Sequence, residues 1–358
     1  MPPARSPAAG LRRRKVFLPL VLLLPLILLT LILIFPSRSI PALRDAALRS
    51  QQTCDYAAGG WVPDSSAESH LRYDHTCKEI FKGWNCIANG KRNGHALLRW
   101  RWKPAGCELL PRLDPLRFLE RHRNTNIGFV GDSLNRNMFV SLVCMLRGVN
   151  GEVHKWRPAG ADRGFTFLRY NLTLAYHRTN LLVRYGRWWS SSKFDPIQSP
   201  MLFFEKGKPI IPPLLPPEGL DLTLKHMITF VNKAMRPNGL KFFSTQSPRH
   251  FEGGDWNEGG SCQRDQPLSS EEVKEFFSLD NNGTNIEARL VNQHLMKALE
   301  QSTTFRVLNV THMSEFRADA HPATTGGKKH DDCMHWCLPG PTDAWNDLLA
   351  ASLAAIQS

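Results

Sequence analysis

The chain has 358 residues and carries 45 lysines and arginines against 32 aspartates and glutamates, a formal net charge of +13. Five of these charges lie in the first 15 residues, where no acidic residue offsets them, which leaves +8 on the remainder. That charge is compatible with an acidic polysaccharide, a membrane surface or an ordinary solvated basic surface, and the location derived next argues against nucleic acid as a partner.

An uncharged, predominantly apolar run occupies residues 16–35, directly after the basic segment Arg12–Lys15. This length suffices to span a bilayer as a helix. By the positive-inside rule, residues 1–15 form a cytosolic tail and everything after the span faces the lumen. A cleaved signal peptide is the alternative, but the run is long for one and no clear small-x-small site follows it. We therefore expect a type II signal-anchor at 16–35, followed by a stem at 36–53.

Eight cysteines, all after the span and even in number, favour four disulfides in an oxidising lumen. The sequence leaves their pairing open. Three acceptor sequons for N-glycosylation agree with a luminal body, and they begin at Asn171, Asn282 and Asn309. The cysteines are Cys54, Cys77, Cys86, Cys107, Cys144, Cys262, Cys333 and Cys337.

The luminal body, of about 320 residues, is long enough for one large α/β domain with an appended lobe. Residues 54–112 are rich in Cys, Trp, Asn and Gly and poor in periodicity, which predicts a loop-rich N-terminal lobe held by disulfides. Residues 113–358 form the second domain, in which strands alternate with helices, so we expect a largely parallel sheet flanked by helices. In chain order we expect a strand at 126–130, a helix at 134–148, a strand at 181–185, a proline-rich loop at 200–219, a helix at 222–234, a strand at 240–244, helical structure at 271–302 interrupted at 281–283, a strand at 305–310 and a helix at 344–356.

A candidate nucleophile lies in the motif Gly131-Asp132-Ser133-Leu134, between the first of these strands and the helix that follows it. Gly131 permits a sharp turn there. Unpaired backbone N–H groups at a helix N-terminus carry partial positive charge, which suits an oxyanion. The alternative is that Asp132 or Ser133 simply caps the helix.

A candidate base and its orienting carboxylate lie about two hundred residues later, in Asp332–Gly340. The spacing of three residues between Asp332 and His335 lets one turn place both on the same side. Asp332 then fixes the tautomer of His335, and His335 takes the proton of Ser133. The alternative is a histidine packed beside Trp336, with Asp332 capping the last helix. The order of the two motifs makes covalent acyl transfer at Ser133 the leading hypothesis.

A zinc site is the competing chemistry, because His330, Cys333, His335 and Cys337 lie close together in the sequence. The spacing Cys-x-His-x-Cys is not a usual tetrahedral pattern, and no second Cys/His pair accompanies it. An oxidising compartment also argues for disulfides, and the proposed mechanism needs no metal.

Read as an ordered set, these motifs resemble the plant trichome birefringence-like family of polysaccharide O-acetyltransferases, which have a GDSL/SGNH-type esterase fold. The resemblance covers nearly the whole luminal body. Departures occur at 261–267, which lacks an acidic stretch, and at 324–329, which is shortened and Gly-rich; both bear on the acceptor rather than on the chemistry. The matching segments are Cys54-Asp55, Gly60–Val62, Cys86–Gly90, Trp100–Trp102, Cys107, Phe129–Leu134 with Arg136-Asn137, Ser247–Phe251, Trp256–Cys262, Arg317–Pro322, Asp332–Gly340 and Asp343–Asn346.

The resemblance implies a catalytic triad of Ser133, His335 and Asp332, in which Ser133 is acetylated by a donor and then passes the acetyl group to a sugar hydroxyl. It implies support of the oxyanion or of the serine loop by Gly131, Asp132, Arg136 and Asn137. Candidates for contacts with the acceptor are His250, Trp256 and Asn257.

The expected function is therefore a Golgi-membrane O-acetyltransferase that acts in the lumen on xylan, mannan, xyloglucan or pectin. An acetyl-esterase with the same triad is the first alternative, because water can replace the sugar hydroxyl. A non-catalytic glycan-binding protein is the second. No bound cofactor is expected. The donor is acetyl-CoA or a membrane-delivered acetyl carrier, and an acetyl-donor transporter is a possible membrane partner.

Overall fold

The computed structural model describes residues 54–66, 70–149, 152–157, 162–179, 186–187, 201–278, 284–300 and 302–357. The chain divides into two units, Met1–Cys54 and Asp55–Ser358, and the description below concerns the second. Within the described ranges no helix is long and apolar enough to cross a membrane. The expected span at 16–35, the strand at 181–185 and Asn282 lie outside these ranges.

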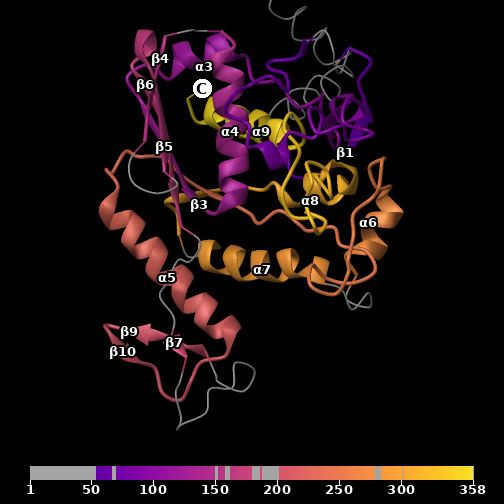
Figure 1. Ribbon diagram of the computed structural model, residues 1–358. Helices are drawn as coiled ribbons and strands as arrows, with labels where there is room; N and C mark the ends of the chain where they lie inside the picture. The colour runs from indigo at the N-terminus through magenta and orange to yellow at the C-terminus, as the bar shows by residue number, and fades with distance from the viewer. Residues whose placement is uncertain are drawn as a thin grey trace, which may run out of the picture. The chain divides into compact units, whose positions relative to one another are not determined.

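The main sheet has four strands in the order β3-β6-β5-β4 (Figure 1). Strand β3 pairs with β6 in parallel, whereas β5 pairs with both β6 and β4 in antiparallel fashion. A second, two-stranded parallel sheet joins β11 to β12. The main sheet is therefore mixed, and the expectation of one largely parallel sheet is corrected. The strands are β3 (Asn126–Gly131), β4 (Val153–Trp156), β5 (Arg163–Phe167), β6 (Leu172–Arg178), β11 (Lys241–Ser244) and β12 (Phe305–Leu308).

The long helix α4 (Ser133–Arg147) follows β3 directly and packs against β3, β6 and the final helix α9 (Thr342–Gln357), as Figure 1 shows. Asp132 begins the helix, since its side chain accepts hydrogen bonds from the backbone N–H groups of Leu134 and Asn135. Ten consecutive residues from Asn137 to Leu146 are buried, so α4 forms the centre of the core.

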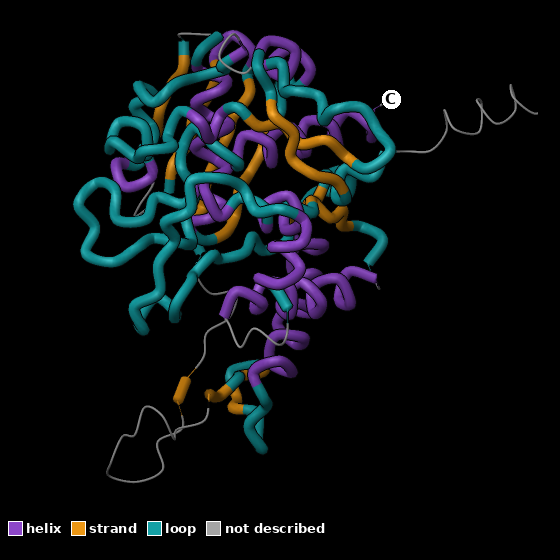
Figure 2. Tube along the Cα trace, turned by 90° about the vertical axis from the view of Figure 1, so that its right-hand side faces the viewer, coloured by secondary structure: helices purple, strands orange, loops and turns teal. Residues whose placement is uncertain are grey.

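The remaining helices follow their local signals. In α3 (Pro115–Arg121), Asp114 caps the first turn and a proline occupies the first helical position. Ser269 and Glu272 form a capping box at the start of α6 (Ser270–Phe276). Helix α5 packs on α7. The hairpin β9–β10 lies at the end of α5 that is farther from the main sheet, as Figure 1 and Figure 2 show. The other elements are α5 (Pro216–Ala234), α7 (Glu287–Glu300), α8 (Thr311–Glu315), β7 (Gly186–Arg187), β8 (Met201–Leu202), β9 (Phe204–Glu205) and β10 (Lys208–Pro209).

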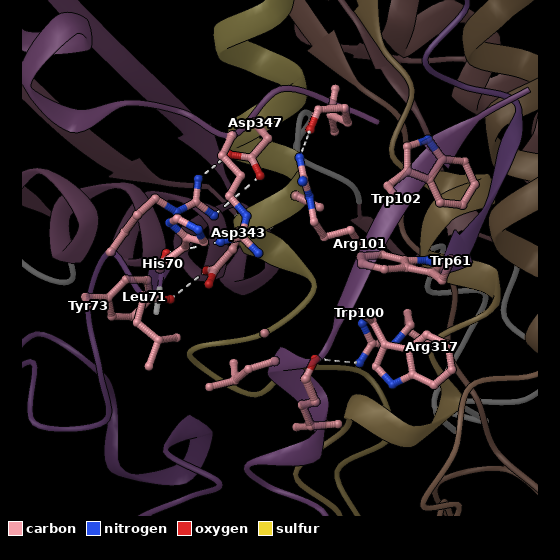
Figure 3. A pocket seen from close by; sticks show the side chains of 17 residues that line it. Trp61, His70, Leu71, Tyr73, Trp100, Arg101, Trp102, Arg317, Asp343 and Asp347 are labelled. Carbon is pink, nitrogen blue, oxygen red and sulfur yellow. Dashed lines mark hydrogen bonds and ion pairs between the residues drawn. The ribbon is translucent and has the colours of Figure 1, made fainter. Parts of the chain in front are cut away.

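The N-terminal region shares its core with the rest of the body. Strands β1 (Gly59–Pro63) and β2 (Trp100–Pro104) pair with each other, and Trp84 and Trp102 belong to the same apolar cluster as α4 and α9. Figure 3 shows where this region meets α9: a small cavity of about 70 Å³ at which the Tyr73 hydroxyl donates to Asp343 at 2.6 Å. Burial raises the pKa of Asp343, while the charge of Arg72 and the hydrogen bonds from Tyr73 and Ser141 oppose that rise.

All eight cysteines are in disulfide form. Three of the pairs are Cys77–Cys144, Cys86–Cys337 and Cys262–Cys333. The last two bracket His335, so both sulfurs that the zinc alternative needs are unavailable as thiolates. Cys262, Cys333 and Asp331 do lie close together, but the two sulfurs are bonded to each other.

Candidate active site

Ser133, His335 and Asp332 form one continuous hydrogen-bonded chain. The Ser133 Oγ lies 2.8 Å from Nε2 of His335, and Nδ1 of His335 lies 2.9 Å and 3.0 Å from the two carboxylate oxygens of Asp332. The backbone N–H of His335 also donates to Asp332, at 3.0 Å. These contacts fix Nδ1 of His335 as a donor and leave Nε2 as the acceptor that faces the serine hydroxyl.

Asp332 is held in its ionised form. Burial alone raises the pKa of this carboxyl, but the hydrogen bonds and charge of His335, together with Lys328, outweigh burial and bring the pKa well below its usual value. The Lys328 ammonium donates to the second carboxylate oxygen at 2.6 Å. Each oxygen of Asp332 therefore has a partner, and a negative charge stands behind His335 at neutral pH.

The loop that carries Ser133 is supported from the sheet. The hydroxyl of Tyr176, a buried residue of β6, donates to the carbonyl oxygens of Asp132 at 2.8 Å and Gly131 at 3.2 Å. Gly131 must be small, because a Cβ there would lie 2.9 Å from the side chain of Asn135. Asp132 caps the helix, so the capping alternative is correct for Asp132, while Ser133 is left to meet His335.

The segment that carries His335 is supported from α4. Asn137, which is fully buried, exchanges two hydrogen bonds with the backbone of Trp336, one from its amide at 3.2 Å and one to its oxygen at 2.9 Å. His321 Nδ1 donates to the carbonyl oxygen of His335 at 2.7 Å. Asn137 therefore holds the loop that carries His335, whereas the sequence predicted that it supports the oxyanion or the serine loop.

Trp84 forms one wall of the site. Its indole stacks on the imidazole of His335, with ring centroids 5.4 Å apart and planes inclined by 28°. The carbonyl oxygen of Trp84 accepts from the backbone N–H of Leu338, and the Cys86–Cys337 disulfide closes the same junction. Arg136 lies over the same indole, 5.5 Å from its centroid, and is half-buried. The sequence pointed to Arg136 and placed His321 in a matching segment without giving it a role, but nothing in the local patterns of Trp84, Tyr176 or Lys328 distinguishes them from core or surface residues.

The three candidates for acceptor contacts differ in exposure. His250 is completely buried and its Nδ1 lies 2.7 Å from Nε2 of His321, so it does not offer its ring to an acceptor, and that expectation is corrected. Burial lowers the pKa of His250 to about 4. Trp256 is 62% exposed and Asn257 is exposed. Both lie between Glu252 and Ser261, whose backbones pair, and the Cys262–Cys333 disulfide ties this loop to the base segment.

A cavity of about 310 Å³ adjoins the serine loop on the side of β11. Gly131, Asp132 and Leu134 form one part of its wall, and Thr245 and Gln246, which follow β11, form another. Apolar side chains of α5 and α7 complete it. The carboxyl ends of β3 and β11 thus face a space that is large enough for a sugar ring.

The sequence was compared with known families and curated proteins. Residues 110–193 and 184–352 match PC-Esterase, a GDSL/SGNH-like acyl-esterase family found in Pmr5 and Cas1p, and residues 52–108 match the PMR5 N-terminal domain. The protein trichome birefringence-like 13 of Arabidopsis thaliana is 57% identical over 353 residues, covering 86% of this chain and 85% of that protein. The protein trichome birefringence-like 12 of the same plant is 40% identical, over 85% of this chain and 86% of its own length. Xyloglucan O-acetyltransferase 3 of Populus trichocarpa is 30% identical, over 85% and 87%. The chain therefore belongs to the trichome birefringence-like family and carries its GDSL/SGNH-like PC-esterase domain.

Proposed function

We propose that the chain transfers an acetyl group to a polysaccharide through an acetyl-serine at Ser133. The observation that carries this proposal is the continuous path from Ser133 Oγ to His335 Nε2, and from His335 Nδ1 to Asp332. The names of relatives, among them xyloglucan O-acetyltransferases, support polysaccharide acetylation as the general activity.

In the first half-reaction, Ser133 Oγ attacks the carbonyl carbon of the acetyl donor while its proton moves to Nε2 of His335. The C–O bond to Ser133 forms, the bond to the donor breaks, and the leaving group takes the proton from His335. The negative charge of Asp332 stabilises the imidazolium during each transfer. We assign the backbone N–H of Ser133, in the first turn of α4, as a donor to the oxyanion.

In the second half-reaction, a sugar hydroxyl takes the place of the donor. It gives its proton to His335, attacks the acetyl carbon and releases Ser133, which recovers a proton from His335. The cavity beside the serine loop is where we place the sugar ring. Trp256 and Asn257, on the exposed loop tied to the base segment, are offered as further acceptor contacts.

We further propose that residues 16–35 anchor the chain in the Golgi membrane, with a cytosolic tail at 1–15, a stem at 36–53 and the body in the lumen. The disulfide state of all eight cysteines supports an oxidising compartment. The exposed side chain of Asn171 agrees with use of that sequon. In this setting the donor is acetyl-CoA or a carrier loaded at the membrane, delivered by a transporter partner.

The test is transfer by the full chain to xylan, mannan, xyloglucan and pectin oligomers in the presence of acetyl-CoA, with Ser133→Ala as the control. Ester-linked acetyl that appears on one polymer and is absent with Ser133→Ala supports the proposal and identifies the acceptor. Release of free acetate without any acetylated polymer would instead make the chain an esterase.

A further inference from the structure

Two buried histidines lie behind the segment that carries His335, and the proposed reaction uses neither ring. His250 and His321 are 71 residues apart in the sequence, and both are fully buried. His250 is also joined to the base segment through the backbone, since its N–H donates to the carbonyl oxygen of Cys333 at 3.1 Å. We call His250 and His321 the histidine pair.

The ring nitrogens of the histidine pair form a row of three contacts between two backbone carbonyl groups. Nε2 of His250 lies 2.9 Å from the carbonyl oxygen of Glu315, and Nδ1 of His250 lies 2.7 Å from Nε2 of His321. Nδ1 of His321 lies 2.7 Å from the carbonyl oxygen of His335. A carbonyl oxygen only accepts hydrogen bonds, so the nitrogen at each end of the row must carry a proton.

The middle contact needs a proton that two neutral rings cannot supply. A neutral imidazole carries one N–H and one lone pair, so two neutral rings have two protons, and the end contacts use both. The facing nitrogens of His250 and His321 would then direct two lone pairs at each other across 2.7 Å. One further proton between these nitrogens turns all three contacts into hydrogen bonds and gives the pair a single positive charge. The row is therefore complete only when the histidine pair holds three protons.

The surroundings of the histidine pair decide the pH range in which that proton is bound. Burial lowers the pKa of both rings, since Trp336 packs on His321 with ring centroids 4.2 Å apart and Phe277 packs on His250 at 5.4 Å. Nearby carboxylates oppose this shift, and nearby cations add to it. The pair therefore takes up its proton below the ordinary imidazole pKa of 6.5, and burial together with the first charge excludes a second proton. The carboxylates are Asp332, Asp319, which is paired with Arg317, and Glu315, which is paired with Arg289 and His312, and the cations are Lys91 and Arg264.

The proton bears on the candidate active site through the carbonyl oxygen of His335. With three protons on the histidine pair, His321 always donates to this oxygen. In the neutral pair, two protons are divided among three contacts, so the contact to His335 competes with the other two. The ring of His335 lies 2.8 Å from Ser133 Oγ, and a loosened backbone at His335 would disturb that distance. Uptake of the proton therefore holds the base in place.

We propose that His250 and His321 share one proton in acidic solution and act together as positioning residues for the base His335. Neither ring touches the reacting atoms, because His321 acts through the carbonyl oxygen of His335 and His250 acts through His321. This inference rests on the proposed function for its effect on acetyl transfer. The shared proton and the position of the His335 ring are observed without catalysis.

The experiment records nuclear magnetic resonance spectra of the full chain with isotope-labelled histidine, from about pH 4 to about pH 8. The shared proton is sought as a far-downfield imidazole signal, and the Nδ1 proton of His335, which faces Asp332, reports the position of the base. His250→Asn replaces the ring with an amide that donates to His321 without taking up a proton. His321→Phe keeps a ring against Trp336 but removes the donor to His335.

The matched control is His122→Phe, at the end of α3. His122 is also buried, its Nδ1 lies 2.8 Å from the carbonyl oxygen of Phe118, and its ring lies 4.2 Å from the ring of Phe118. Steady-state kinetics and thermal unfolding accompany the spectra of each variant. The unmodified chain alone decides whether the proton is shared, so this arm does not depend on whether a variant folds.

We expect the shared-proton signal to appear as the pH falls below about 6.5, and to be absent from His250→Asn and His321→Phe. His321→Phe should lose the Nδ1 signal of His335 and lower kcat about tenfold at unchanged KM, because it leaves a buried carbonyl group without its donor. His250→Asn and His122→Phe should keep that signal, with kcat within about twofold of the unmodified chain.

The proposal is overturned if His250 and His321 titrate independently, or if no shared-proton signal appears at the acidic end. Equal losses of kcat and of the His335 signal in His321→Phe and His122→Phe would overturn the positioning role. If the signals behave as expected while the unmodified chain transfers no acetyl group, only the proposed function fails.

Discussion

The indole of Trp84 stacks on the imidazole of His335 with ring centroids 5.4 Å apart, although 250 residues of chain separate them. The N–H of Leu338 donates to the carbonyl oxygen of Trp84 at 2.8 Å, and the Cys86–Cys337 disulfide lies beside it. The N-terminal region therefore holds the base of the candidate active site in place and is not a separate appendage.

Removal of the Cys86–Cys337 disulfide by paired alanine substitution is expected to lower both stability and turnover. The free energy of unfolding should fall by about 2–5 kcal/mol, as for other native disulfides, and kcat should fall because the His335 segment loosens. The control is paired alanine substitution of Cys77–Cys144, which ties α4 to the N-terminal region away from His335. Denaturant unfolding and kcat are measured for both variants. Equal losses of kcat in the two variants would contradict a specific role of the Cys86–Cys337 disulfide at the site.

Ser133→Ala is expected to lower acetyl transfer by about a thousandfold or more, since no other group supplies the nucleophile. Stability should hardly change, because Asp132 rather than Ser133 caps α4. Transfer kinetics and thermal unfolding of the same preparation check both parts. Full activity in this variant would show that the nucleophile is a different residue.

Lys328→Met is expected to lower kcat by about tenfold with little change in KM. The ammonium donates to Oδ2 of Asp332, while Nδ1 of His335 lies within 3.0 Å of both carboxylate oxygens, so loss of the ammonium removes a contact that fixes the carboxylate against His335. Lys329→Met is the matched control, because Lys329 is the next residue and is exposed. Steady-state kinetics of both variants, each tested for an unchanged melting temperature, distinguish positioning from a general loss of charge.

Acid is expected to weaken the fold through Asp332. The pKa of this carboxyl in the folded chain lies well below its ordinary value of 3.8, which the unfolded chain retains. At a pH between the folded and the unfolded pKa of Asp332, the unfolded chain binds more protons than the folded chain. The stabilising contribution of Asp332 is therefore complete above about pH 4 and is lost as the pH falls further. Urea unfolding at a series of pH values should show the stability difference between the unmodified chain and Asp332→Asn narrowing below pH ~4. A difference that stays constant there would contradict the pKa shift.

Local patterns predicted those parts of the fold that local physics decides. The helix expected at 134–148 is α4, the strands expected at 240–244 and 305–310 are β11 and β12, and the helix expected at 344–356 is α9. The interrupted helical segment at 271–302 is α6 and α7. The sheet topology was harder to predict from the sequence, because the residues of short strands such as β4 and β5 do not determine whether the strands pair in parallel or antiparallel fashion.

The residues of the candidate site also divide into those that local motifs predicted and those that they did not. Ser133, Asp332 and His335 were identified from motifs, and the structure brings all three together. Trp84, Tyr176 and Lys328 owe their positions to pairings between segments that lie far apart or to loop geometry, and no local pattern reveals them. His321 stood in a matching segment, but its contact with the His335 carbonyl oxygen could not be predicted from that segment. His250 shows the opposite failure: a polar residue in a matching motif suggested a ligand contact, whereas it is buried against His321.

The measurement that tests the central claim most directly is mass spectrometry of the full chain after brief incubation with an acetyl donor and without acceptor. The account predicts one acetyl group, located on the peptide that contains Ser133, absent from Ser133→Ala and removed when an acceptor polysaccharide is added. An acetyl group on another residue, or efficient acetylation of the polysaccharide by a chain that never carries acetyl at Ser133, would contradict the account.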